Sequence, residues 1–468
     1  MGGHVALERF ARKERMLSFT FSYNGRAFPL RYRYDTSVNF CDLERQYGSA
    51  FMETVYFHIA AFEGNKFASL KPDTFDWGPF SHLLTRAFES LWREVLHNVW
   101  AQWRFENDEP WYPGPEFITP FSPGDPIAPV SASPGNIDTL LFCSGGKDSL
   151  ACLILLENGA IPYDTLTYSS SIYGAEEAQH RLAERIINTA GLGARNRRRQ
   201  WVEDSFMTSD ILSDPDVESK TLTAAETPCS IFGSLPYALA NGYRYIVLGH
   251  ERSANSGQVY WEKTGEEVNH QWGKSYEAEK LLNRYIRTHL IPNITYFSLL
   301  QPIYDALIFY LLNHNPPAVL ATNSCNISTD GCERCPKCAY VYLGMRAYLP
   351  RDIVDRKFKS NLFDIPENQY TYRQLLGLED QLPFECIGQR DEVELAFTLC
   401  ETRGYKGKAI DAYKAAGLPS SDLSEILGKY LAVYSGHGVP PDIADNVLPH
   451  MEKAAAQAKN EIPERLHC

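Results

Sequence analysis

Apolar and polar residues alternate along residues 17–34 on both sides of Asn24-Gly25. Alternation with a period of two predicts strands with one buried face, and Asn-Gly is a strong signal for a hairpin turn. Between residues 80 and 103, in contrast, apolar residues recur at steps of three and four. This spacing predicts an amphipathic helix with a broad buried face. Residues 1–109 are therefore expected to form a small α+β domain.

A run of prolines then interrupts the pattern. Eight prolines fall between residues 110 and 134. Because proline fixes φ and has no backbone N–H, such a run suits neither a helix nor a central strand. We therefore expect a semi-rigid linker over residues 110–136, with a domain boundary at that point.

Short apolar runs alternate with helical patterns after the linker. These segments are a strand over 138–143, an apolar helix up to Gly159, a strand from Thr165, helices over about 175–190 and 228–241, and a strand from Tyr243. Strands that alternate with helices predict a parallel sheet with helices on both faces. We expect an α/β domain over 137–349, followed by a helical C-terminal region over 350–468.

Composition limits the kind of protein without indicating a site. The chain has 468 residues, of which 44% are hydrophobic and 22% charged, so it is globular rather than disordered or fibrous. Its net charge of −13 disfavours a nucleic-acid or membrane-surface partner. The chain has neither an apolar run long enough for a membrane helix nor a secretory leader, so we expect a cytoplasmic protein.

The most specific motif is a glycine loop, SGGKDS, that follows a strand and opens a helix. It consists of Ser144, Gly145, Gly146, Lys147, Asp148 and Ser149. Glycine lets backbone N–H groups approach a phosphate closely, and a helix N-terminus adds partial positive charge. Lys147 adds a full charge, the two serine hydroxyls can donate, and Asp148 can cap the helix or hold Mg²⁺. The loop is therefore expected to cradle an anion, although it lacks the Walker A spacing.

This loop resembles the pyrophosphate-binding loop of the N-type ATP pyrophosphatases, the PP-loop superfamily. The resemblance implies an adenine nucleotide alpha hydrolase-like fold that binds ATP and Mg²⁺. It also implies cleavage of ATP between its α and β phosphates, with AMP passing to an oxygen of the substrate. In that superfamily the segment after the second strand lines the adenine pocket, which corresponds here to Tyr168 and Ser169.

Four of the eleven cysteines form a cluster, namely Cys325, Cys332, Cys335 and Cys338. Four thiolates at this spacing suit a closed tetrahedral Zn²⁺ site, which is structural because no position is left open for water. A catalytic zinc, an iron–sulfur cluster and a cysteine nucleophile are the alternatives. A similar four-cysteine zinc site occurs in the PP-loop enzyme that makes 7-cyano-7-deazaguanine.

Polar residues are concentrated in residues 249–279, directly after a predicted strand. The residues of this segment that can carry chemistry are His250, Glu251, Arg252, His270 and Lys274. In a parallel sheet, ligands bind at the carboxyl ends of the strands, where this segment and the glycine loop both begin. We therefore expect a substrate site here.

Five short segments sharpen the resemblance: ERSAN at 251–255, NHQWGKS at 269–275, YFSLLQP at 296–302, NSCN at 323–326 and CERCPKCAYVYL at 332–343. Together they look like the ATP-dependent peptide epimerase family of bacterial cell-wall synthesis. That family inverts the terminal glutamate of UDP-N-acetylmuramoyl-L-alanyl-L-glutamate. Gln301 stands where the family pattern has Arg, and Asp305 where it has Glu, so a related peptide is an alternative substrate.

The resemblance implies an isomerase that works through an adenylated intermediate. AMP on the terminal carboxylate would make a mixed anhydride whose carbonyl accepts charge as an enolate, so that a base can remove the Cα proton. Residues 144–149 would hold pyrophosphate and Mg²⁺. Arg252 and Lys274 would hold substrate carboxylates or the developing charge. The acid–base candidates are His250, Glu251 and His270.

Other functions fit parts of the sequence. A PP-loop amidotransferase or nitrile synthase, like the 7-cyano-7-deazaguanine synthase, matches the cysteines but does not account for residues 1–109. A tRNA-modifying enzyme conflicts with the net charge, because the one basic run, 195–199, is short and is expected to be a solvated loop. A non-catalytic zinc-stabilised binding protein conflicts with the intact loop at 144–149. The expected partner is a peptide, free or linked to a nucleotide.

Overall fold

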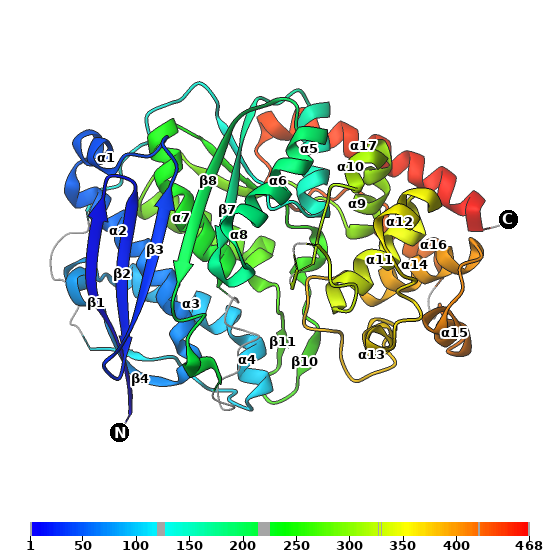
Figure 1. Cartoon of the computed structure of the whole chain (residues 1–468), viewed down its shortest axis with the longest axis horizontal. Coiled ribbons are helices and arrows are strands. Elements are labelled where there is room, and N and C mark those ends of the chain that lie inside the picture. The colour runs from blue at the N-terminus through cyan, green and yellow to red at the C-terminus, as the bar shows by residue number, and fades with distance from the viewer. Residues whose placement is uncertain are drawn as a thin grey trace.

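The computed structural model describes residues 2–118, 127–213, 225–325, 327–328, 330–419 and 422–466 (Figure 1). The strands of its main sheet are β1 (Gly3–Lys13), β2 (Met16–Tyr23), β3 (Arg26–Tyr34), β4 (Pro72–Asp76), β5 (Glu116–Phe117), β6 (Thr139–Phe142), β7 (Tyr163–Ser170), β8 (Ala194–Asp204), β9 (Tyr245–Leu248) and β12 (Thr295–Ser298). A separate ribbon consists of β10 (Val259–Trp261) and β11 (Glu266–Val268).

The main sheet is continuous across the described part of the chain, in the order β12-β9-β6-β7-β8-β3-β2-β1-β4-β5. Each strand from β12 to β8 runs parallel to its neighbours in this group, as expected for residues 137–349. β8 then pairs antiparallel with β3, so the N-terminal strands extend the same sheet. The domain boundary at the linker therefore stays a prediction, and residues 119–126 of that linker lie outside the described residues.

Helices cover the sheet and fill the C-terminal part. The helices before the glycine loop are α1 (Phe40–Tyr47), α2 (Ser49–Glu63), α3 (Arg86–Val99) and α4 (Ala101–Glu106). Those between the central strands are α5 (Lys147–Asn158), α6 (Glu176–Ala190), α7 (Glu226–Asn241) and α8 (Tyr276–His289). Those after β12 are α9 (Asp305–Leu311), α10 (Pro316–Val319), α11 (Pro336–Tyr348), α12 (Arg351–Lys357), α13 (Pro366–Leu375), α14 (Arg390–Thr402), α15 (Lys408–Ala415), α16 (Leu423–Tyr430) and α17 (Pro441–Leu466).

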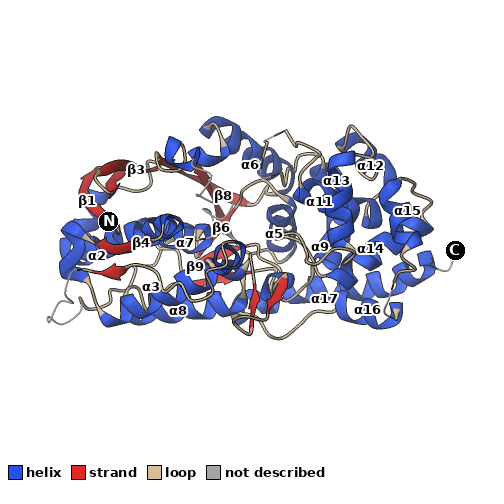
Figure 2. Ribbon diagram, turned by 90° about the horizontal axis from the view of Figure 1, so that it is seen from below, coloured by secondary structure: helices blue, strands red, loops and turns tan. Residues whose placement is uncertain are grey.

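The central strands are buried on both faces, because successive residues enter different cores. Leu140 and Ile246 pack into the core that contains α2, α7 and α8. Their neighbours Leu141 and Val247 pack into the core that contains α5, α9 and α11. This accounts for the continuous apolar runs of β6 and β9, since a parallel sheet is covered on both sides. Figure 2 shows helices on both sides of these strands and the helices from α11 to α17 beside the sheet.

The predicted hairpin at Asn24-Gly25 is confirmed, whereas the helix predicted over 80–103 has different bounds. β2 and β3 meet at Asn24 and Gly25, whose φ angles of 49° and 81° suit a tight hairpin turn. The helix expected over 80–103 begins only at residue 86, because the Thr85 hydroxyl caps it and accepts from Phe88 N at 3.1 Å. The helix breaks again near Trp100, where α4 takes over.

The basic run 195–199 is not a solvated loop, because it lies in β8. Arg197 and Arg199 form ion pairs with Glu184 of α6 at 2.8 and 2.5 Å. The charge of this run is therefore partly neutralised within the fold. The first half of β8, which holds this run, pairs with β7, and the second half, residues 200–204, pairs with β3 and so joins the two parts of the sheet.

The C-terminal residues are helical, as expected. α17 packs against α5 and α9, which returns the end of the chain to the helices beside the glycine loop. Among the described residues, no helix combines the length and the apolar character that crossing a membrane requires.

Candidate active site

The glycine loop lies between β6 and α5, at the carboxyl edge of the parallel strands. Gly145 has a φ of 95°, and a Cβ there would lie 2.4 Å from Leu182 Cγ, so both the backbone and the available space require glycine. Ser149 Oγ accepts from Ser144 N at 3.1 Å and closes the loop on itself. The loop thus brings the N-terminus of α5 to the sheet edge, an arrangement that favours an anion.

The Lys147 side chain turns inward from this loop. Its side chain is 1% exposed, and Nζ lies 2.5 Å from Asp148 Oδ1 and 2.5 Å from Asp305 Oδ1. Tyr340 OH donates to the second oxygen of Asp305 at 2.8 Å. Burial opposes the ammonium charge, but Asp148, Asp305 and Glu251 raise the pKa of Lys147 above its ordinary value. The positive charge predicted for the loop is therefore neutralised by the carboxylates of Asp148 and Asp305.

Two further buried carboxyl groups complete this cluster, which we call the Lys147 cluster. Burial and the charges of Asp305 and Glu392 raise the pKa of Glu251 well above its ordinary value. Burial and Asp305 likewise raise the pKa of Glu392. A raised pKa favours the protonated form of each group, which can donate a proton.

A second cluster forms around Lys274, one of the predicted residues. Lys274 Nζ lies 2.9 Å from Cys386 Sγ, and His270 and Glu385 lie beside the same sulfur. Lys337 reaches this point from α11 and donates to the backbone oxygen of Cys386. We call these residues the Cys386 cluster.

The side chain of Gln301 connects the two clusters. Its amide nitrogen donates to the backbone oxygens of Glu251 and Lys274 at 3.4 and 3.2 Å, and the residue is fully buried. Gln389 continues this connection by donating to Ser253 O at 3.4 Å. The segment that carries Cys386 and Gln389 therefore runs beside the polar segment after β9.

The remaining predicted residues of the polar segment diverge. His250 Nδ1 lies 3.1 Å from Ser298 Oγ, and burial together with the charge of Lys274 lowers the pKa of His250 well below its ordinary value. Arg252 instead stacks over the ring of Tyr434 at 3.9 Å and donates to Gly436 O at 3.3 Å. His250 is thus a neutral imidazole near Lys274, whereas Arg252 faces residues 434–436.

Tyr168 and Ser169 occupy opposite faces of β7. Tyr168 borders a small cavity of about 40 Å³ that Lys66 and Glu226 also line. Ser169 Oγ is buried, donates to Gln200 O at 2.7 Å and lies 2.8 Å from His180 Nε2. Only Tyr168 of the two therefore has open space beside it, and an adenine-binding role for either stays a prediction.

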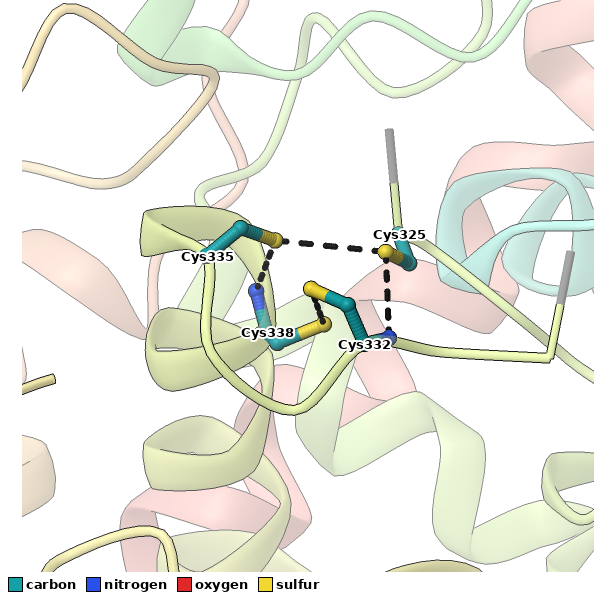
Figure 3. Close-up of side chains that lie close together, drawn as sticks. All are labelled: Cys325, Cys332, Cys335 and Cys338. Atoms are coloured by element: carbon teal, nitrogen blue, oxygen red, sulfur yellow. Dashed lines mark hydrogen bonds between the residues drawn. The ribbon is translucent and has the colours of Figure 1, made fainter. Parts of the chain in front are cut away.

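The four predicted cysteines converge (Figure 3). Cys325 Sγ lies 4.0 Å from Cys335 Sγ, and Cys332 Sγ lies 3.9 Å from Cys338 Sγ. Four sulfurs around one ion at about 2.3 Å would be about 3.8 Å apart, so these separations suit metal ligation. Backbone N–H groups of Ser328 and Cys332 also point at Cys325 Sγ, at 3.3 and 3.4 Å, which favours a thiolate. The cluster can therefore hold one metal ion; Asn326 of the predicted motif lies outside the described residues.

The cysteine segment is tied to the glycine loop. Asn323 N donates to Gly145 O at 2.9 Å, and Ser324 Oγ accepts from Lys147 N at 3.1 Å. α11, which begins directly after Cys335, supplies both Lys337 and Tyr340. A metal ion held by the four cysteines would fix elements that contact both clusters.

Two parts of the chain match known protein families. Residues 230–299 match the family model described as the MurL N-terminal domain, and residues 321–418 match the MurL C-terminal domain. The chain is 29% identical over 286 residues to a UDP-N-acetyl-alpha-D-muramoyl-L-alanyl-L-glutamate epimerase of Salinispora tropica, covering 59% of this chain and 58% of that protein.

A protein of the same name from Micromonospora sp. is 28% identical over 293 residues, with 60% and 61% covered. Another from Xanthomonas oryzae pv. oryzae is 26% identical over 328 residues, with 66% and 68% covered. The chain is related to the MurL epimerase family. The match spans about three fifths of the first two curated relatives. No solved structure matches the chain.

The MurL matches include the Cys386 cluster and the four clustered cysteines, whereas the glycine loop lies outside both ranges. Two residues were expected to depart from the family pattern. Gln301 is buried and its side chain donates to backbone oxygens, and Asp305 forms the ion pair with Lys147. Cys386, Lys337 and Glu392 were not found from the sequence. Cys386 stands apart from the other cysteines with no ligand spacing, and Glu392 looks like an ordinary acidic residue in the first turn of a helix.

The metal site generates a first prediction. Replacing Cys335→Ser removes one of four thiolates, so purified protein should lose most of the roughly one metal ion per chain that elemental analysis should find in the wild type. Cys41→Ser, which changes an exposed thiol outside the cluster, should keep the full metal content. Metal content that is equal in the wild type and Cys335→Ser would show that the cluster binds no ion.

The buried charge of Lys147 generates a second prediction. Lys147→Met should lower the free energy of unfolding by about 3–5 kcal/mol, because it leaves the Asp305 carboxylate buried without a cation. The double variant Lys147→Met/Asp305→Asn should recover much of that loss. Urea denaturation of the wild type and the two variants measures both effects. A loss in Lys147→Met below about 1 kcal/mol, the size of a surface pair, contradicts the assignment.

Proposed function

We propose that this protein is an ATP-dependent epimerase that inverts the terminal L-glutamate of UDP-N-acetylmuramoyl-L-alanyl-L-glutamate or of a related peptide. The observation that carries the proposal is the glycine loop at the carboxyl edge of a parallel sheet, in a chain whose curated relatives are named for this epimerisation. The loop supports the use of ATP, and the relatives support the substrate.

The residues around the loop fit a nucleotide phosphate and its metal ion. The N-terminus of α5 offers N–H groups to the pyrophosphate, and the hydroxyl of exposed Ser144 can donate to it. Asp148 is 32% exposed at the loop and can hold Mg²⁺, which would neutralise phosphate charge. The ion pair with Lys147 orients this carboxylate. Transfer of AMP to the terminal carboxylate of the peptide then activates the neighbouring Cα–H.

The charge states of the surrounding groups suit proton transfer. The raised pKa of Glu251 favours its protonated form, which could act as an acid, and the lowered pKa of His250 favours the neutral imidazole. The Lys274 ammonium is available to stabilise the enolate oxygen that forms when Cα loses its proton. His270 lies beside Lys274 and Cys386, where it can exchange a proton with either. ATP cleavage would drive the inversion beyond an equal mixture of epimers.

The four cysteines are proposed to hold a structural Zn²⁺. Four thiolates fill a tetrahedral site and leave no position for water, so the ion would not take part in the reaction. Its role would be to hold residues 323–324 against the glycine loop and α11 against the two clusters.

This proposal predicts the effect of a single change at the loop. Asp148→Asn should reduce AMP formation and inversion together by at least about 100-fold, because the Mg²⁺ that balances the phosphate charge loses a carboxylate ligand. The reaction contains ATP, Mg²⁺ and the UDP-linked dipeptide, with AMP measured by chromatography and the configuration of glutamate by chiral derivatisation.

Asp445→Asn is the matched control, since Asp445 is exposed on α17, and it should behave like the wild type. In the wild type, AMP and the D-ended product should appear in equal amounts. A wild-type reaction that inverts glutamate without any AMP would overturn the proposed use of ATP, and AMP that forms only when ammonia is added would favour the amidating alternative.

A further inference from the structure

Cys386 has the surroundings of a thiolate. Lys274 Nζ contacts its sulfur at 2.9 Å, His270 lies against the sulfur from the segment after β11, and Lys337 donates to its backbone oxygen. Glu385 is the opposing charge, on the same segment as Cys386. Burial favours the neutral thiol, but the charges of Lys274 and Lys337 and the hydrogen bond with His270 lower the pKa of Cys386 to about 6.

The buried cysteines outside the four-cysteine cluster, among the described residues, have no lysine ammonium in contact with the sulfur. Burial raises the pKa of the thiols of Cys143, Cys152, Cys229 and Cys400. Burial therefore favours the neutral thiol in these four residues, whereas Cys386 is half-buried and the ammonium beside its sulfur favours the thiolate.

A metal ion is a poor alternative partner for this sulfur. His270, Glu385 and Cys386 lie close enough to share an ion. The Lys274 ammonium, however, already occupies the position beside the sulfur, and the positive charge of Lys337 adds to it, so a second cation would be repelled. The geometry is that of a thiolate–ammonium pair.

The location of this pair connects it with the proposed reaction. Gln301 links the backbone of Lys274 with that of Glu251, and Glu251 belongs to the Lys147 cluster under the glycine loop. A thiolate carries no proton and can accept one. Once it has done so, the sulfur is neutral, and the Lys274 ammonium is free to pair with another anion.

We propose that the Cys386 thiolate removes the Cα proton of the adenylated terminal residue. This inference rests on the proposed function. The Cα–H bond breaks, an S–H bond forms on Cys386, and the electron pair moves into the acyl carbonyl to give an enolate. A proton of solvent origin, delivered on the opposite face, then forms the new Cα–H bond, and the Cys386 thiol returns its proton to solvent.

Lys274 has a second role in this scheme. Before proton transfer its ammonium pairs with the thiolate, and afterwards the sulfur is neutral while the enolate oxygen is negative. The ammonium can then pair with the enolate, so the charge that activates the base also stabilises the intermediate. Lys274 thus stabilises the thiolate before proton transfer and the enolate after it.

The test separates adenylation from proton transfer. Wild type and Cys386→Ser are incubated in D₂O with ATP, Mg²⁺ and UDP-N-acetylmuramoyl-L-alanyl-L-glutamate, and AMP formation and deuterium at the glutamate Cα are measured together. Cys386→Ser should still form AMP, while deuterium incorporation should fall by at least about 100-fold, because a serine hydroxyl is not ionised. Cys41→Ser is the control and should retain both.

The outcomes distinguish this inference from the proposed function. Absence of AMP and deuterium with the wild type overturns the proposed function itself. Deuterium incorporation in Cys386→Ser at the wild-type rate overturns the role of Cys386 alone. Loss of AMP and deuterium together in Cys386→Ser also overturns it, because the cysteine would then serve binding or folding rather than proton transfer.

A second measurement needs no substrate. The rate at which iodoacetamide modifies Cys386, followed by peptide mass spectrometry, should rise with pH through a midpoint of about 6. In Lys274→Met this midpoint should move upward, because the neighbouring positive charge is lost. A wild-type midpoint near that of an ordinary thiol, about 8.5, would overturn the thiolate assignment.

Discussion

The buried ammonium of Lys147 constrains the architecture around the glycine loop. An ammonium without water is costly by several kcal/mol unless carboxylates and hydrogen bonds surround it closely. Asp148 supplies one carboxylate from the same helix and Asp305 supplies the other from the first turn of α9. Tyr340 of α11 completes the group through Asp305. Three helices must therefore converge at one point before this charge can be tolerated.

α11 extends that constraint to the rest of the site. Its start is set by Cys335, whose sulfur accepts from Cys338 N at 3.4 Å, and its first turns provide Lys337 and Tyr340. One of these residues contacts the Cys386 segment and the other contacts Asp305. A metal ion on the four cysteines would thus fix both clusters at a distance. In this account the cysteines organise the site, and the chemistry takes place at the sheet edge.

Local sequence patterns predicted the elements whose residues follow a regular apolar or ligand spacing. The hairpin at Asn24-Gly25, the parallel strands β6, β7 and β9 and the convergence of the cysteines all follow from spacing and residue type. β8 was missed because its first half, 194–199, is rich in arginine and carries no apolar alternation; ion pairs to α6 compensate for this composition. Cys386 and Glu392 were missed for another reason. Their charge states depend on neighbours more than 80 residues away in sequence, such as Lys274 and Asp305, which only the tertiary structure identifies.

The central claim is that AMP is transferred to the terminal carboxylate of the peptide. The most direct test uses UDP-N-acetylmuramoyl-L-alanyl-L-glutamate labelled with ¹⁸O in the terminal α-carboxylate, together with ATP and Mg²⁺, and measures the mass of the AMP released. The account predicts AMP that carries ¹⁸O, because water attacks the acyl carbon and the bridging oxygen leaves with AMP. D-ended product formed together with unlabelled AMP would contradict it.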